Sequence, residues 1–276
     1  MMTKMRKMRN ALVAAAVLVL LAGCARNRED AALKPDPGQS DLQYVQSKGT
    51  LVVGITDFAP MDYRDGEEWT GFDAQLAQAF AETLGVTLEF REIDWDQKTK
   101  YLEDGRIDCI WNGMTMTQEL EEAISCSEPY LSNAQVVVLR KGEKGQFRAI
   151  EDCQHLLFAV EAGSTGETLL SGLKYRYTSY PTQMEALQSV SEKKADGTVI
   201  DIIMASYHIG DDREFPDLEF DISLNDEKIC VGFRKDSDLT QEANAFLERS
   251  FEDGTIYSLA DQYGIRSAVL EREEER

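Results

Sequence analysis

Short apolar runs alternate with amphipathic stretches along most of the chain. Leu51–Ile55 is an unbroken apolar run typical of a buried strand, and Ala74–Leu84 repeats large apolar residues at every fourth position, as one face of a helix requires. Asp73 is expected to cap the start of that helix and Gly85 to end it. The same reasoning predicts strands at Thr87–Glu92 and Ile107–Trp111 and a helix at Asp96–Glu103.

A second series of the same kind begins with a strand at Gln135–Leu139. The pattern predicts further strands and helices in this order: Leu156–Val160, a helix opening with a capping box at Thr182, Thr198–Ile200, Lys228–Phe233, and helices near Thr240–Glu252 and Thr255–Tyr263. There is no internal repeat of fixed period. Two successive series with a terminal helical return indicate a two-lobed α/β protein with largely parallel sheets.

The first 23 residues have the layout of an export signal. Four basic residues and no acid precede an apolar run, residues 11–22, which is too short to span a bilayer comfortably. Small residues before Cys24 resemble the lipobox of bacterial lipoproteins, whose cysteine is lipidated and becomes the mature N-terminus. We expect a signal peptide at 1–23, lipidation of Cys24 and a flexible tether at 24–40; the alternative is an uncleaved anchor helix with an incidental cysteine.

Charge restricts the partners of the chain. Its 276 residues carry 29 basic and 50 acidic side chains, a net charge of -21. A nucleic-acid partner or an anionic lipid surface requires clustered basic residues, so neither is expected. The length is about twice that of a usual domain, and 43% hydrophobic residues are enough to form cores.

Sequence motifs for catalysis or metal binding are missing. There is no glycine-rich phosphate loop and no HExxH, Ser164 does not lie in a nucleophile elbow, and the two histidines, His155 and His208, are isolated. We therefore expect no catalytic residue, no metal and no cofactor. Besides Cys24 there are four cysteines, which allow three full disulfide pairings that the sequence does not separate: Cys109, Cys126, Cys153 and Cys230.

Polar and aromatic residues follow several of the predicted strands, where α/β sheets bind ligands. Each has an alternative structural role: Phe58 and Trp95 as core residues, Thr117 and Asp201 as helix caps. Together they form a set of strand-end groups from both series: Asp57, Phe58, Trp95, Asn112 to Thr117, Ser164, Thr165 and Asp201.

Ten short segments resemble, in order, the bacterial extracellular solute-binding proteins of family 3, the polar amino-acid receptors of ABC importers. They run over roughly residues 45–266 and include Leu51 to Asp57, Gly71-Phe72-Asp73, Ile93 to Asp96, Gly105 to Asp108, Asn112 to Thr117, Ser127 to Tyr130, Gly163-Ser164-Thr165, Ala195 to Asp201, Val231 to Lys235 and Asp253-Gly254-Thr255. One such segment is a weak signal, whereas ten in family order are specific.

The resemblance implies a type II periplasmic-binding-protein fold, a clamshell that closes by a hinge around one small polar solute. Lobe 1 is expected at 41–131 plus 229–276 and lobe 2 at 132–228. An extracytoplasmic, lipid-anchored monomer that serves an ABC permease is implied as well. By position, Phe58 and Trp95 would pack on an amino-acid-like solute, and Gly113, Thr115 and Thr165 would bind its carboxylate. Asp201 would pair with its α-ammonium group, and Asp57 would meet a polar side chain.

One position departs from the family. Its members usually carry an arginine that grips the solute's carboxylate three residues after the second threonine of the Thr-x-Thr segment, and here that position is Leu120. Either another cation or the helix N-terminus near Thr117 takes over, or the solute has no α-carboxylate. Two other functions stay open: an enzyme on the same scaffold, such as a prephenate-type dehydratase, and a sensor subunit that signals through a partner.

Overall fold

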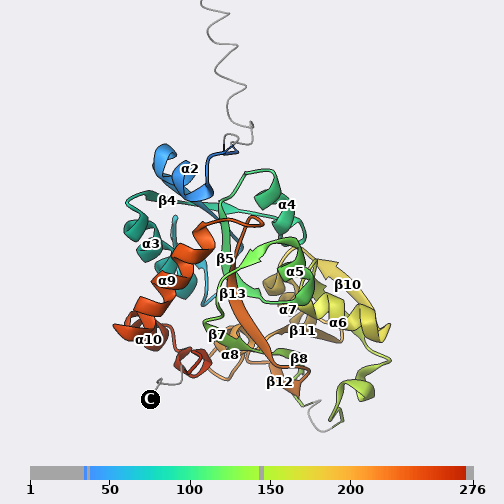
Figure 1. Cartoon of the computed structure of the whole chain (residues 1–276). Coiled ribbons are helices and arrows are strands. Elements are labelled where there is room, and N and C mark those ends of the chain that lie inside the picture. Colours follow the sequence, from blue (N-terminus) through green and yellow to red (C-terminus); the bar gives the residue numbers. More distant parts are fainter. Residues whose placement is uncertain (1–33, 36–37, 143–145, 272–276) are drawn as a thin grey trace, which may run out of the picture. The chain divides into compact units, whose positions relative to one another are not determined.

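Two sheets, each flanked by helices, organise the chain (Figure 1). The computed structural model describes residues 34–35, 38–142 and 146–271. The predicted signal peptide, Cys24 and most of the tether lie outside these residues. Within the described part, no helix has the length and apolar character that crossing a membrane would need.

The first sheet has the strand order β4-β1-β5-β13-β6, with β7 paired to β13. Strand β1 runs parallel to β4 and β5, whereas β13 is antiparallel to its three partners. Its strands are β1 Thr50–Ile55, β4 Thr87–Glu92, β5 Cys109–Thr115, β6 Ser125–Cys126, β7 Leu131–Asn133 and β13 Glu227–Phe233. The other elements in this part are α2 Asp41–Lys48, the hairpin β2 Tyr63–Asp65 and β3 Glu68–Thr70, α3 Phe72–Leu84, the 3-10 turn η1 Trp95–Gln97, α4 Lys98–Glu103, α5 Gln118–Ala123, α9 Leu239–Glu252, α10 Thr255–Gln262 and η3 Arg266–Ala268.

The second sheet has the order β10-β9-β11-β8-β12. Strand β9 is parallel to β10 and β11, and β8 is antiparallel to β11 and β12. Its strands are β8 Gln135–Arg140, β9 Leu157–Glu161, β10 Arg176–Tyr180, β11 Gly197–Asp201 and β12 Leu218–Ser223, and its helices are η2 Ile150–Cys153, α6 Thr165–Leu173, α7 Gln183–Ser191 and α8 Ile202–His208.

The two-sheet α/β fold class is confirmed, with one refinement. Only the strand–helix–strand part of each sheet is parallel, because the strands next to the two chain crossings, β8 and β13, run the other way. Polar groups at these crossings bond to one another: the backbone N–H of Gln135 donates to Asn225 Oδ1 (2.9 Å), and the side-chain amide of Asn133 donates to Glu227 Oε2 (2.9 Å). The lobe boundaries themselves stay a prediction.

Strand β5 extends further than its apolar run predicts. The predicted segment ended at Trp111, whereas the strand continues to Thr115 and is buried throughout. The extension pairs with β13, and Asn112 is satisfied inside it, because its amide donates to Thr56 Oγ1 (2.8 Å) and accepts from the Thr56 N–H (2.7 Å). Asn112, Gly113 and Thr115 are therefore strand residues and do not follow a strand.

Asp73 is not a helix cap. Helix α3 begins at Phe72 with Gly71 at the capping position, and Asp73 is fully buried. Its carboxylate accepts from the Gly113 N–H (2.6 Å) and the Tyr130 hydroxyl (2.8 Å), so it joins α3 to β5 and to the segment before β7. Burial raises the pKa of Asp73 to about 7, although these hydrogen bonds oppose the shift.

The four cysteines in the described residues are free thiols, so none of the three disulfide pairings is present. Cys126 and Cys230 lie on the neighbouring strands β6 and β13, and a hydrogen bond between them lowers the pKa of Cys126. The described residues also contain no group of His, Cys, Asp and Glu side chains that could hold a metal ion.

Candidate functional site

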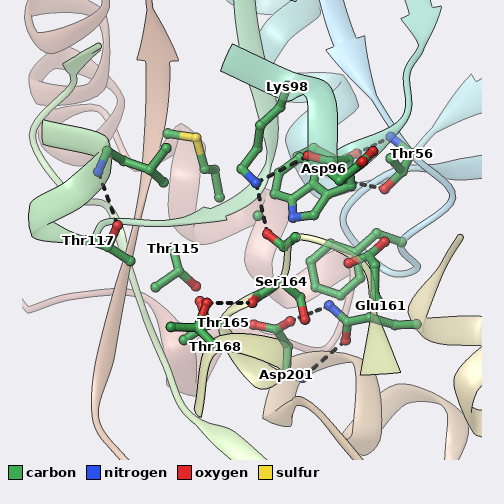
Figure 2. A pocket seen from close by; sticks show the side chains of 18 of the residues that line it. Thr56, Asp96, Lys98, Thr115, Thr117, Glu161, Ser164, Thr165, Thr168 and Asp201 are labelled. Atoms are coloured by element: carbon green, nitrogen blue, oxygen red, sulfur yellow. Dashed lines mark hydrogen bonds between the residues drawn. The ribbon is translucent and has the colours of Figure 1, made fainter. Parts of the chain in front are cut away.

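A cavity of about 380 Å³ is lined by residues from the elements of both sheets. The structure brings all seven of the binding residues predicted from the sequence to this cavity: Asp57, Phe58, Trp95, Gly113, Thr115, Thr165 and Asp201. Leu120 lines it too, so the position where the family has its arginine belongs to the same site. Figure 2 shows the polar side chains of the cavity converging from opposite walls.

The Phe58 ring and the Gly113 backbone form one wall together. Gly113 has φ +58°, and a Cβ atom there would lie 2.3 Å from Cε1 of Phe58, so only glycine fits beneath the ring. Phe58 is nearly buried by this packing. Phe58 is thus part of the folded core and also lines the cavity.

Two of the expected carboxylate donors are already used within the protein. The Gly113 N–H donates to Asp73, and the Thr115 hydroxyl donates to Glu227 Oε2 (3.0 Å). The Gly113 N–H and the Thr115 hydroxyl are therefore engaged within the protein, and the expectation that these residues bind a solute's carboxylate stays a prediction. The Thr165 N–H differs, because it opens helix α6, where first-turn N–H groups lack an acceptor within the helix.

Asp201 ends β11 with a buried carboxylate. It stands at the capping position of α8, but its side chain forms no capping bond and instead accepts from the amides of Asn133, Gln135 and Gln183. Burial raises the pKa of Asp201 to about 7, and repulsion by Glu227 acts in the same direction. This carboxyl is held in place by amides alone, with no cation of the described residues paired to it.

Glu161 is a second buried acid that the sequence analysis did not select. It ends β9 and is 4% exposed, and burial followed by repulsion from Asp201 raises its pKa to about 8. Glu161 directly follows the predicted strand Leu156–Val160, so the strand-end rule that selected Asp57 and Asp201 would have found it.

Lys98 is the other residue missed. Only 9% exposed, its ammonium group donates to Gly163 O (2.9 Å) and Trp95 O (3.2 Å) and lies 4.7 Å from the centre of the Trp95 ring. Burial lowers the pKa of Lys98, and the nearby Glu161 partly opposes this shift. Gly163 follows β9 of the second sheet, so this hydrogen bond joins the elements of the two sheets across the cavity.

Acidic side chains outnumber basic ones around the cavity. Five acids and one lysine line it: Asp57, Asp96, Glu119, Glu161, Asp201 and Lys98. The first three are exposed, whereas Glu161, Asp201 and Lys98 are buried.

Thr117 caps helix α5, because its hydroxyl accepts from the Leu120 N–H (3.2 Å), in agreement with its alternative structural role.

The sequence profile of the bacterial extracellular solute-binding proteins, family 3, matches residues 51–266. The chain belongs to this family. The resemblance drawn from the ten sequence segments is thereby confirmed, and the members of this family are mainly extracellular solute-binding proteins.

Relatives within and around this family are similar over most of their length. The arginine-binding extracellular protein ArtP of Bacillus subtilis is 24% identical over 94% of this chain and 98% of its own. The structure of a substrate-binding protein of an ABC uptake transporter from Streptococcus pneumoniae, with bound histidine, superposes with a TM-score of 0.78. It is 27% identical, and the match covers 86% of this chain and 100% of that one. Cyclohexadienyl dehydratase of Pseudomonas aeruginosa is 27% identical over 72% of this chain and 74% of its own.

Proposed function

We propose that this protein captures a cationic amino acid in the cavity and delivers it to an ABC importer. The observation that carries the proposal is a small cavity with a buried lysine, Lys98, on one side and two buried carboxyl groups, Glu161 and Asp201, on the other. A zwitterion with an additional positive charge complements that arrangement. The arginine-binding name of ArtP and the histidine bound in the Streptococcus pneumoniae protein support the same class of solute.

The size and charge of the cavity favour a small cation. About 380 Å³ lies in the range of small-molecule sites. A buried carboxyl without a cationic partner is costly to ionise, and a solute ammonium removes that cost when it binds. Asp201 bonds only to amides and Glu161 has only the nearby Lys98, so the two carboxyls together favour a solute with an α-ammonium group and a positively charged side chain.

Hinge closure is part of the proposal. The chain crosses between the sheets twice, after β7 and before β13, and the lobes are proposed at 41–131 plus 229–276 and at 132–228. The Lys98–Gly163 hydrogen bond joins elements of both sheets beside the cavity, as a contact of a closed form would. Closure around the solute would exclude water and strengthen the charge-assisted hydrogen bonds inside.

Purified protein should bind one or more of L-arginine, L-lysine and L-histidine in isothermal titration calorimetry against the twenty standard L-amino acids. Ligand recovered after incubation should be chemically unchanged in mass spectrometry. Conversion of prephenate to a new product would instead support the dehydratase alternative that the Pseudomonas aeruginosa relative raises. Binding to none of the amino acids would contradict the proposal, and import of the bound amino acid by cells would separate transport from sensing.

We also propose that Cys24 carries the lipid anchor. A Cys24→Ala variant is expected to lose labelled palmitate and to leave the membrane fraction, because thioether-linked lipid is then absent. Cys153→Ala is the matched control, since it removes a buried cysteine of the folded part and should leave the label in place. Palmitate labelling of the Cys24→Ala protein at the parent level would contradict this anchor.

A further inference from the structure

The cavity contains a buried lysine, Lys98, whose nearest acidic influence is Glu161, which opposes the lowering of its pKa without bonding to it. Lys98 donates to two backbone carbonyl groups, but no carboxylate of the described residues forms an ion pair with it. An ammonium group has three donors, so one N–H is left after these two bonds. Figure 2 shows the Lys98 nitrogen reaching into the cavity, with Ser164, Thr165, Glu161 and Asp201 on the other side.

The other groups that line the cavity near Lys98 offer few hydrogen-bond donors to a solute's carboxylate. Leu120 offers no donor, the Gly113 N–H is bonded to Asp73, and the Thr115 hydroxyl is bonded to Glu227. The N–H groups at the start of α6, near Thr165, are neutral donors that lack an acceptor within the helix. They lie next to Gly163, whose carbonyl accepts from Lys98.

We infer that Lys98 is the cation that anchors the solute's α-carboxylate in this protein, together with the N-terminus of α6. The inference rests on the proposed function and adds to it the residue that replaces the family's arginine. The anion completes the ammonium's third hydrogen bond and compensates a charge that is 9% exposed. Trp95, with its ring 4.7 Å from the ammonium, holds the side chain in place.

Two features fix the position of this lysine relative to α6. Gly163 has φ +71°, and a Cβ there would lie 2.6 Å from the Asp96 Cα, so the backbone after β9 approaches η1 as closely as glycine allows. The Lys98–Gly163 hydrogen bond spans the same approach. The carboxylate anchor is therefore assembled from both sides of the cavity, and solute binding and closure would depend on the same lysine.

The experiment compares L-arginine with L-argininamide, which keeps both positive groups and lacks the carboxylate. In calorimetry at about pH 6.5, the parent protein should bind L-arginine more than about tenfold tighter than the amide. Lys98→Met should weaken L-arginine by at least about tenfold and change the affinity for the amide by less than about threefold. Lys98→Arg, which keeps a cation, should retain most of the preference for the acid.

Lys100→Met is the matched control, because this lysine lies two residues further along α4 and is exposed. It should bind both probes as the parent does. General damage to the cavity by Lys98→Met would weaken both probes equally, and that result would overturn the inference. So would equal affinity of the parent for the two probes, a comparison that needs no variant. If the parent binds none of L-arginine, L-lysine and L-histidine, the proposed function fails and the inference with it.

Discussion

The Asp201→Ala protein is expected to bind its cationic amino acid more than a hundredfold more weakly than the parent. Asp201 is 5% exposed and lies at the cavity with three amide donors holding its carboxylate. Removing one partner of a buried charge pair costs about 3–5 kcal/mol, since the solute's ammonium is then left in the closed site without its anion. Calorimetric titration with L-arginine, L-lysine or L-histidine measures the change.

Two further variants separate charge from packing. Asp201→Asn keeps the shape and part of the hydrogen bonding, so it should fold like the parent and still lose most of the affinity. Asp212→Ala removes an exposed acid that does not line the cavity, and a screened charge of this kind should change the affinity by about threefold or less. Parent-like binding by both Asp201 variants would show that the ammonium binds elsewhere.

The fold and the location of the site could be predicted from the sequence because both depend on local patterns. Apolar runs and helical periodicity are repeated in each series, and strand ends collect ligand groups whatever their detailed contacts. All seven predicted residues therefore line one cavity. What these patterns do not contain is the bonding of each group across the fold.

Asp73 and Gly113 illustrate that limit. The sequence favours a capping role for an acid at the start of a helix. Asp73 instead accepts a hydrogen bond from the Gly113 N–H, forty residues later in β5, and this is the N–H that was expected to donate to the solute's carboxylate. Lys98 is a second example, because the sequence predicts that a lysine at the start of a helix lies in solvent, whereas this one is buried. Lys98 is covered in part by the close approach of Gly163, which lies in the turn after β9 of the other sheet. Such pairings become visible only in three dimensions.

Binding of L-arginine, whose side chain stays cationic at every pH used, is expected to tighten as the pH rises from about 6 to about 8. In the free protein the pKa of Glu161 is raised to about 8 and that of Asp201 to about 7, mainly by burial. Both carboxyls are largely protonated at the lower pH, and a solute cation binds the ionised forms better, so binding releases protons. Linkage then predicts that affinity grows by roughly tenfold or more over this range.

Glu161→Gln should reduce this pH dependence of the affinity, because an amide does not titrate. Calorimetry at several pH values, in buffers of different ionisation enthalpy, would count the protons released on binding.

The stability of the free protein should follow the opposite trend. An acid whose folded pKa is raised costs no stability below its unfolded pKa of about 4.3 and costs its full penalty only above about 8. The melting temperature of the free parent should thus fall as the pH rises from about 6 to about 8, and that of Glu161→Gln should fall less. Affinity that stays flat or declines over the same range would contradict the assignment of Glu161 and Asp201 to the solute's cationic groups, because a carboxyl that binds a cation must lose its proton to do so.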